Sequence, residues 1–335
     1  MSTTRIHPRD ALFEAEDLLP ALPVCDHYCG VEVRMRKSLE LQADLGPVFD
    51  VTLDCEDGAP MGGESEHALL VAEILLSGLN RHGRVGARVH PVGHPSFEQD
   101  LDTLIGRAGG RLAYLMIPKP LGADDVRLAC DVVDHLTHVH GHGRPIPVHV
   151  LVETHGALRE VAQIAAHPRV ESISFGLMDF VSAHRGAIPA SAMSAAGQFS
   201  HPLVLRAKLE IAAACHAFGK TPSHSVVTEF TDLDALADAA GKACRELGFT
   251  RMWSIHPNQI RPIVEAFAPS AAEVDQAIEI IHAAQAADWA PTRQRDTLHD
   301  RASYRYFWRV LERARRTGAP LPVEVEQDFF PPTPG

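Results

Sequence analysis

Two carboxylates in this chain stand where they could hold a metal ion. Glu153 and Asp179 each follow a short apolar run, and their separation of 26 residues is about the length of one helix and one strand. If the two strands are parallel neighbours, both carboxylates meet at one edge of the sheet. Hard cations such as Mg²⁺ are bound by one or two carboxylates together with substrate oxygens. The pair predicts a Mg²⁺ site, with Mn²⁺ as the alternative ion.

Each carboxylate also has a simpler interpretation when it is taken alone. A glutamate after a strand can favour a helix N-terminus through the helix dipole, and an aspartate in Gly-x-x-Asp can cap a turn. The metal interpretation gains weight because polar side chains stand at most of the other predicted strand ends: Asp54, Glu56, Asp57, Arg88, His90, Lys119 and His256. Scattered surface charges would not follow nearly every strand, so this repetition predicts an active site.

Arg88 indicates the kind of chemistry. A planar guanidinium pairs with carboxylates and enolates, so Arg88 is expected to hold the acid group of a substrate or to stabilise an oxyanion. A metal ion beside such an arginine makes an enolate accessible from a carbonyl acid. The structural alternative is an ion pair between Arg88 and the acids Asp54, Glu56 and Asp57. Both can hold at once, because an arginine oriented by a carboxylate is also positioned for a substrate.

The elements that must position these residues alternate between short apolar strands and amphipathic helices. This alternation specifies a parallel α/β protein, and eight units over roughly 250 residues fit a (β/α)₈ TIM barrel. An open doubly wound sheet is the alternative, disfavoured because no glycine-rich fingerprint follows the first strand. The predicted strands lie within residues 21–25, 47–60, 84–91, 111–120, 146–153, 170–176, 222–230 and 251–260.

Three segments are expected along the chain. Residues 1–20 form an N-terminal arm, residues 21–270 form the catalytic barrel, and residues 271–335 form a C-terminal helical extension. The extension contains a helix whose aromatic side chains we expect to be exposed and to pack on a neighbouring subunit. These side chains are Tyr304, Tyr306, Phe307 and Trp308.

The composition excludes several classes of function. Of the 335 residues, 45% are hydrophobic and 22% are charged, as in ordinary soluble proteins. The net charge of −12 argues against nucleic-acid binding, and no apolar run is long enough to cross a membrane. The first residues contain acids and lack the apolar region of a signal peptide. Six scattered cysteines are expected to be reduced thiols, which indicates a cytoplasmic protein.

Short motifs at the strand ends resemble those of a known family. In order, they resemble the motifs of the citrate lyase β-subunit-like (CitE-like) family within the HpcH/HpaI aldolase superfamily, over roughly residues 30 to 310. The motifs are Leu53-Asp54-Cys55-Glu56-Asp57, Ala87-Arg88-Val89-His90, Ile117-Pro118-Lys119, Val152-Glu153-Thr154, Phe175-Gly176-Leu177-Met178-Asp179 and Ile255-His256-Pro257-Asn258-Gln259-Ile260.

The resemblance implies a Mg²⁺-dependent lyase or synthase. Such enzymes break or form a carbon–carbon bond between a 2-oxo acid and an acyl-thioester enolate, usually on coenzyme A. It further implies a homotrimer or hexamer, a metal held by Glu153 and Asp179, and an enolate stabilised by Arg88. In related malyl-CoA lyases a C-terminal aspartate reaches a neighbour's active site, and Asp300 lies at about the matching place.

The resemblance also extends to residues around the substrate. Asp57 is expected to act in proton transfer, and Glu56 and Lys119 are expected to bind substrate beside Arg88. Lys37 stands where the family meets phosphates. Two departures concern the thioester end of the pocket: the first predicted strand lacks the family's Arg-Ser and Pro-Gly, and bulk near Trp253 is expected to reshape the acyl pocket.

Two other functions remain open at this point. One is a class II pyruvate-dependent aldolase acting on free hydroxy-oxo acids. Such aldolases place a histidine after Asp-x-Glu, where this chain has Asp57, and this difference favours the thioester lyase. The other is a non-catalytic barrel that binds a metal and a small acid. The presence of Glu153, Asp179 and Arg88 counts against it.

Overall fold

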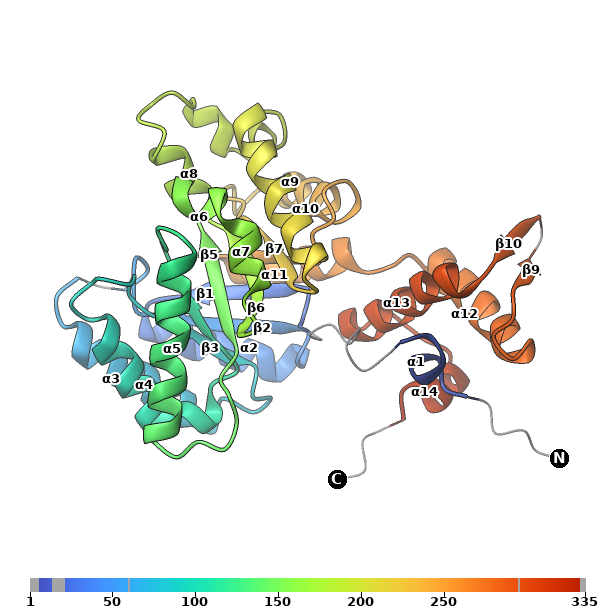
Figure 1. The fold of residues 1–335 in the computed structure, drawn as a ribbon, viewed down its shortest axis with the longest axis horizontal. Helices are drawn as coiled ribbons and strands as arrows, with labels where there is room; N and C mark the ends of the chain where they lie inside the picture. Colours follow the sequence, from blue (N-terminus) through green and yellow to red (C-terminus); the bar gives the residue numbers. More distant parts are fainter. Residues whose placement is uncertain (1–5, 14–21, 60, 295, 332–335) are drawn as a thin grey trace. The chain divides into compact units, whose positions relative to one another are not determined.

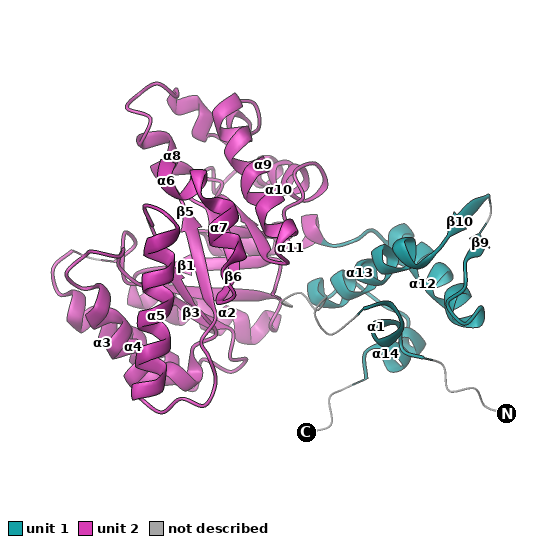
Figure 2. Cartoon of the chain, viewed as in Figure 1, with its two compact units in different colours: residues 1–19, 268–335 teal, residues 20–267 magenta. Residues whose placement is uncertain are grey.

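The chain folds into two compact units. The computed structural model describes residues 6–13, 22–59, 61–294 and 296–331. One unit comprises residues 20–267, and the other comprises residues 1–19 together with residues 268–335. Figure 2 colours the two units separately. The larger unit carries the predicted strand-end residues up to His256, and the smaller one carries Asp300.

The larger unit is a closed barrel of eight parallel strands in sequence order (Figure 1). The last strand pairs in parallel with the first, so the sheet has no free edge. The prediction of a (β/α)₈ TIM barrel is therefore confirmed, and the open doubly wound sheet is excluded. The strands are β1 (Cys25–Cys29), β2 (Phe49–Asp54), β3 (Val85–Arg88), β4 (Leu115–Ile117), β5 (Val148–Val152), β6 (Val170–Phe175), β7 (Thr221–His224) and β8 (Arg251–Ser254).

Helices surround the strands and bury their apolar faces against them. In α4 (Phe97–Ala108), the buried residues Leu101, Leu104, Ile105 and Ala108 recur at the three- and four-residue spacing of one helix face. The others around the barrel are α2 (Glu32–Leu45), α3 (Glu64–Leu76), α5 (Ala123–Val139), α6 (His155–Arg159), α7 (Val161–Ala166), α8 (Leu177–Ser182), α9 (Pro202–Ala217), α10 (Leu233–Arg245) and α11 (Pro257–Phe267). Every strand therefore delivers its carboxyl end to the same mouth.

The first strand lies four residues later than predicted. Residues 21–25 were expected to form it because they are apolar, but β1 begins at Cys25 and includes Asp26 and His27, which are both buried. Asp26 forms an ion pair with Arg251, in which Arg251 Nη2 lies 3.0 Å from Asp26 Oδ2. His27 Nδ1 lies 2.8 Å from Ser254 Oγ on β8. These polar residues fit inside a strand because β8 supplies a partner for each of them, and Thr52 on β2 and Tyr114 also donate hydrogen bonds to Asp26 Oδ1.

The buried His27 makes stability depend on pH. Burial is the main cause that lowers the pKa of His27 to about 4 from an ordinary value near 6.5. Between pH 6.5 and 4 the unfolded chain therefore takes up a proton that the folded chain does not, so stability falls as the pH falls. We expect His27 to account for about 2.5 kcal/mol of the stability lost between pH 7 and pH 4.5.

Urea unfolding of wild type and His27→Gln at the two pH values measures this contribution. His27→Gln should lose less stability on acidification than wild type by that amount. The matched control is His138→Gln, at the exposed end of α5, which should keep the wild-type pH dependence. Equal pH dependence in wild type and His27→Gln would show that His27 is not the group responsible.

The smaller unit is mainly helical and has its own apolar core. It contains α1 (Pro8–Leu12), α12 (Ala271–Ala286), a hairpin of β9 (Thr292–Gln294) and β10 (Thr297–His299), α13 (Arg301–Thr317) and α14 (Val323–Phe329). Much of the predicted arm, residues 1–20, lies outside the described residues. Its described part does not stand alone, because Leu12 packs in the same core as the C-terminal helices.

The expected exposure of the α13 aromatics was partly wrong. Tyr304 and Trp308 are fully buried in the core of the smaller unit, whereas Tyr306 is 58% exposed. The spacing explains the difference, since residues four positions apart lie on one helix face and Tyr306 falls between them. No helix in the described ranges is both long and apolar enough to cross a membrane.

Candidate active site

The barrel mouth brings together most of the predicted site residues. Asp54 ends β2 and is the register partner of Arg88 at the end of β3. Lys119 and Glu153 follow β4 and β5, and Asp179 lies in the first turn of α8, directly after β6. The side chains from these successive strands are connected by ion pairs and hydrogen bonds.

Arg88 is held from two directions by carboxylates. Its Nε lies 2.7 Å from Asp54 Oδ1 and its Nη2 lies 2.9 Å from Asp54 Oδ2, which is a two-pronged pairing. The same Nη2 lies 3.0 Å from Glu56 Oε2. Burial lowers the pKa of Arg88 to about 10, so the guanidinium is still charged at neutral pH. The ion pair considered as the structural alternative for Arg88 is confirmed, and it fixes the guanidinium at the mouth.

A glycine in the loop after β2 completes the support of Asp54. The backbone N–H of Gly58 donates to Asp54 Oδ2. A Cβ atom at Gly58 would lie 2.3 Å from the same oxygen, which is too close for any side chain. The loop can therefore wrap around Asp54 only with glycine at this position.

Lys119 links three of the acids. Its Nζ lies 2.6 Å from both Glu56 Oε1 and Asp57 Oδ2, and 3.9 Å from Asp179 Oδ1. Burial alone would lower the pKa of Lys119, but the hydrogen bonds to Asp57 and Glu56 outweigh it and raise the pKa. Lys119 is therefore a fixed cation and not a base. Its backbone, at φ +50°, also donates a 2.9 Å hydrogen bond from N–H to Glu153 Oε1.

Glu153 occupies a buried and confined position at the mouth. Its side chain is buried, and burial followed by the nearby charge of Asp179 raises its pKa to about 8. A Cβ atom at Gly176 would lie 2.3 Å from Glu153 Oε2, so glycine leaves the space that this carboxylate needs. Asp179 is about half exposed at the same mouth.

The oxygen donors at the mouth fit a divalent cation. Asp54, Glu56, Asp57, Glu153 and Asp179 supply five carboxyl groups, and the ion pairs among the described residues there involve two cations, Arg88 and Lys119. Carboxylate oxygens are hard donors of the kind that Mg²⁺ prefers. Within the described residues no group of three or more His, Cys, Asp or Glu could hold a metal ion. Glu153 and Asp179 would therefore need substrate or water oxygens to complete a metal shell.

Tyr28 is a site residue that the sequence analysis missed. Its hydroxyl contacts Arg88 Nη2, and the guanidinium lies over its ring at 4.5 Å from the centroid. The signal was the alternation of a strand, because Tyr28 lies two residues after Asp26 and so on the same face. That signal could be used only once β1 was known to include both residues.

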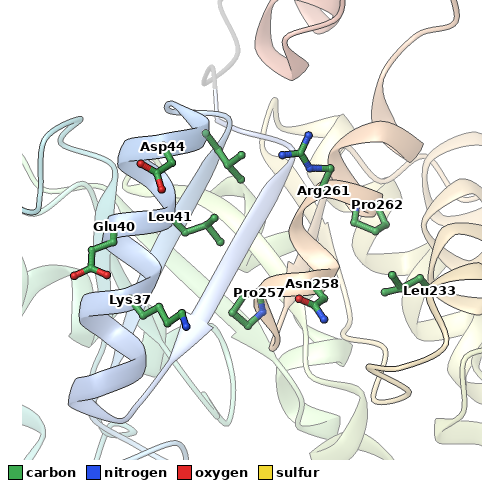
Figure 3. A pocket seen from close by; sticks show the side chains of 10 residues that line it. Lys37, Glu40, Leu41, Asp44, Leu233, Pro257, Asn258, Arg261 and Pro262 are labelled. Atoms are coloured by element: carbon green, nitrogen blue, oxygen red, sulfur yellow. The ribbon is translucent and has the colours of Figure 1, made fainter.

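Two predicted residues lie apart from the acids. Lys37 lines a groove of about 520 Å³ on the flank of the barrel, between α2 and α11. Figure 3 shows Lys37, Pro257 and Asn258 towards one end of the groove and Asp44 and Arg261 towards the other. Asp300 belongs to the smaller unit, where it caps α13.

Comparisons with known proteins agree with this arrangement. Residues 49–257 match the family model of HpcH/HpaI aldolase/citrate lyase. The L-malyl-CoA/beta-methylmalyl-CoA lyase of Cereibacter sphaeroides is 29% identical over 247 residues, covering 71% of this chain and 77% of that protein. The mitochondrial citramalyl-CoA lyase of Mus musculus is 27% identical over 263 residues, covering 75% of this chain and 72% of that protein.

Solved structures show the same fold. A citrate lyase from Burkholderia xenovorans LB400 is 52% identical with a TM-score of 0.84, covering 97% of this chain and 99% of that chain. The protein CitE from Mycobacterium tuberculosis, solved with magnesium, acetoacetate and coenzyme A, is 22% identical with a TM-score of 0.67. That alignment covers 89% of this chain and 99% of CitE, and at this identity it shows the fold alone.

Proposed function

We propose a carbon–carbon lyase function for this chain, which belongs to the HpcH/HpaI aldolase/citrate lyase family. In this function it breaks or forms a bond between a 2-oxo acid and the enolate of an acyl-CoA thioester, with Mg²⁺. The chain is an enzyme of the carbon–carbon lyase type, as its named relatives are. The observation that carries the proposal is the arrangement at the mouth, where Arg88 is fixed by Asp54 and Glu56 beside the acids Glu153 and Asp179.

Glu153 and Asp179 are the residues proposed to hold Mg²⁺. The ion, when bound, supplies a Lewis acid that stabilises negative charge on substrate oxygens. Arg88 binds the oxo group and stabilises the enolate, because its guanidinium is held at the mouth before substrate arrives. Lys119 and Glu56 position the acid substrate around it.

Two further residues are proposed to move protons. In the cleavage direction, Asp57 accepts the hydroxyl proton as the carbon–carbon bond breaks, which leaves the 2-oxo acid and the thioester enolate. Asp57 can reach a substrate because its side chain is 57% exposed, and the hydrogen bond from Lys119 holds it at the mouth. Asp300 then gives a proton to the enolate carbon. Lys37, in the flank groove, is proposed to meet the phosphates of coenzyme A.

One panel of reactions tests the proposal. Purified protein with Mg²⁺ is incubated with acetyl-CoA or propanoyl-CoA and with glyoxylate, pyruvate or oxaloacetate, and adducts are detected by mass spectrometry. We expect a new hydroxyacyl-CoA that disappears when EDTA removes the metal. A parallel incubation with free hydroxy-oxo acids detects an aldolase instead. Turnover of the free acids alone, or no Mg²⁺-dependent adduct, would contradict the thioester lyase.

The position of Asp300 permits a test that separates chemistry from structure. Asp300 Oδ1 accepts hydrogen bonds from the backbone N–H groups of Ala302 and Ser303 at 3.0 and 3.3 Å. Asparagine also caps helices well, so Asp300→Asn should keep the fold and lose the charge. We expect turnover to fall by about 100-fold, the usual contribution of an acid–base group, with unchanged Mg²⁺ affinity. An unchanged rate would show that Asp300 is only structural.

We propose that Asp300 acts in a neighbouring subunit of a homotrimer or hexamer. Leu298 and Tyr306, near Asp300 in the chain, are 71% and 58% exposed and would supply apolar contact with a partner. Mixing Asp300→Asn with a Glu153→Gln variant should then restore part of the activity, because hybrids contain some intact sites. No recovery after subunit exchange would place Asp300 at its own barrel or outside the chemistry.

A cytoplasmic location is part of the proposal. Cys25, Cys29, Cys55, Cys130 and Cys215 are buried with free thiols. Buried free thiols are typical of proteins in reducing compartments.

A further inference from the structure

Gln198 fixes the segment that joins α8 to α9, residues 183–201 (Figure 1). Its side chain is fully buried and is hydrogen-bonded from three sides. Its Oε1 accepts hydrogen bonds from Lys208 Nζ at 2.7 Å and from Ser225 Oγ at 2.8 Å. Its Nε2 donates to the backbone C=O of Val226 at 3.3 Å. Lys208 lies on α9, and Ser225 and Val226 directly follow β7, so Gln198 attaches the segment both to α9 and to the barrel.

Lys208 occupies a position that is unfavourable for a lysine. Its side chain is fully buried, and its Nζ lies 4.0 Å from the centroid of the Phe199 ring. Burial lowers the pKa of Lys208 well below its ordinary value, and no carboxylate among the described residues opposes this shift. A buried amine without an acidic partner costs free energy that an apolar side chain of similar length would not. Stability alone would therefore favour an apolar residue at this position of α9.

The segment that Gln198 fixes packs against α8. Ala192, in a 3₁₀ turn of the segment (Ala190–Met193), is buried in the same core as Phe180 and Val181 of α8. Because α8 has only six residues, its own hydrogen bonds stabilise it poorly, and its direction depends on what packs against it. Asp179 lies in the first turn of α8. The direction of its carboxylate therefore depends on the path of the segment.

We infer that Lys208 is a positioning residue for Asp179, the proposed metal ligand. Lys208 fixes Gln198, Gln198 fixes the segment between α8 and α9, and this segment sets the direction of α8 and of the carboxylate that it carries. Lys208 acts through these contacts and not by binding the ion or the substrate. The inference rests on the proposed function, since it concerns the Mg²⁺ site which that function requires.

Metal binding in the absence of substrate tests this role. Lys208→Met keeps the length of the side chain but removes the donor to Gln198. Isothermal titration calorimetry of the metal-free protein with Mg²⁺ should give a dissociation constant about tenfold above that of wild type, as is usual when a group that supports a metal ligand is lost. In turnover, the Mg²⁺ concentration for half of the maximal rate should rise by the same factor. The kcat at saturating Mg²⁺ should stay within about threefold, because both metal ligands are intact.

Limited digestion with trypsin reports on the segment itself. Arg185 is exposed within it, so cleavage after Arg185, followed by mass spectrometry, should be faster in Lys208→Met than in wild type. The matched control is Ile105→Val, which removes one buried methylene group from α4 and should keep the wild-type Mg²⁺ affinity and cleavage rate. Ser225→Ala removes only the second donor to Gln198 Oε1 and should weaken Mg²⁺ binding in the same direction.

The possible outcomes distinguish the inference from the function on which it rests. No binding of Mg²⁺ by wild type would contradict the proposed metal site itself. Wild-type Mg²⁺ affinity in folded Lys208→Met would overturn the positioning role and leave the metal site standing. An equal loss of affinity in Ile105→Val would also overturn it, because general destabilisation would then be the cause. If circular dichroism shows that Lys208→Met does not fold, the Mg²⁺ affinity of Ser225→Ala decides between the same two results.

Discussion

Replacing Glu153 by glutamine is expected to abolish Mg²⁺-dependent turnover while the barrel stays folded. Glutamine keeps the shape and can still accept the hydrogen bond from the backbone N–H of Lys119, but it loses the charge that a metal needs. We expect a fall in kcat of about 1,000-fold or more, since Lewis-acid stabilisation of the enolate is lost. Steady-state rates over a range of Mg²⁺ concentrations, together with thermal melting, measure both parts of this prediction.

The pKa of Glu153 predicts the direction in which Glu153→Gln changes thermal stability. Because burial and Asp179 raise this pKa to about 8, the metal-free protein at pH 7 already holds the carboxyl largely protonated. Glutamine resembles that neutral form, so Glu153→Gln should melt no lower than metal-free wild type. The control is Asp124→Asn in α5, whose carboxylate is 85% exposed. Wild-type turnover in Glu153→Gln, or equal loss in Asp124→Asn, would overturn the metal-site assignment.

Replacing Arg88 by lysine is expected to lower kcat by about 100- to 1,000-fold, the range for loss of a donor to a developing oxyanion. Lysine keeps one positive charge near Asp54 but cannot pair with both of its oxygens and still contact Glu56. The KM for the 2-oxo acid should also rise, because Arg88 binds that acid. Rates measured with each substrate varied in turn separate the two effects.

Arg88→Ala is expected to lower folding stability, unlike Arg88→Lys. It would leave the wholly buried carboxylate of Asp54 without its cation, which costs about 3–5 kcal/mol of folding stability. Comparison of the two variants therefore separates catalysis from folding. Arg127→Lys, at an exposed pair on α5, is the matched control and should leave both rates and stability unchanged. A kcat for Arg88→Lys within a few-fold of wild type would remove Arg88 from the chemistry.

Much of the candidate site could be predicted because its residues follow the strands directly. The carboxyl ends of all strands in a parallel barrel meet at one mouth, so a side chain one or two positions after a strand is placed by local sequence alone. Arg88, Lys119, Glu153 and the acids after β2 were found in this way, and the structure brings them together. Their roles in metal binding and catalysis remain predictions.

Residues whose environment comes from distant parts of the chain could not be predicted. The aromatics of α13 have the same spacing whether they face solvent or a core, and only the packing of α1, α12 and α14 decides that Tyr304 and Trp308 are buried. Asp26 and His27 are polar, so the local sequence does not place them inside a strand. Their partners on β8, Arg251 and Ser254, lie more than two hundred residues later.

The carboxylates after β5 and β6 show which features local sequence determines and which depend on the tertiary structure. By itself, the sequence determined the eight-fold alternation and the carboxylates Glu153 and Asp179 at the strand ends, because periodicity and strand termini are local properties. Only the tertiary structure decided what surrounds them. Closing the barrel places β1 beside β8, so that Tyr28 stacks on Trp253 and contacts Arg88. Contacts between the first and last strands depend on closure, which no local pattern encodes.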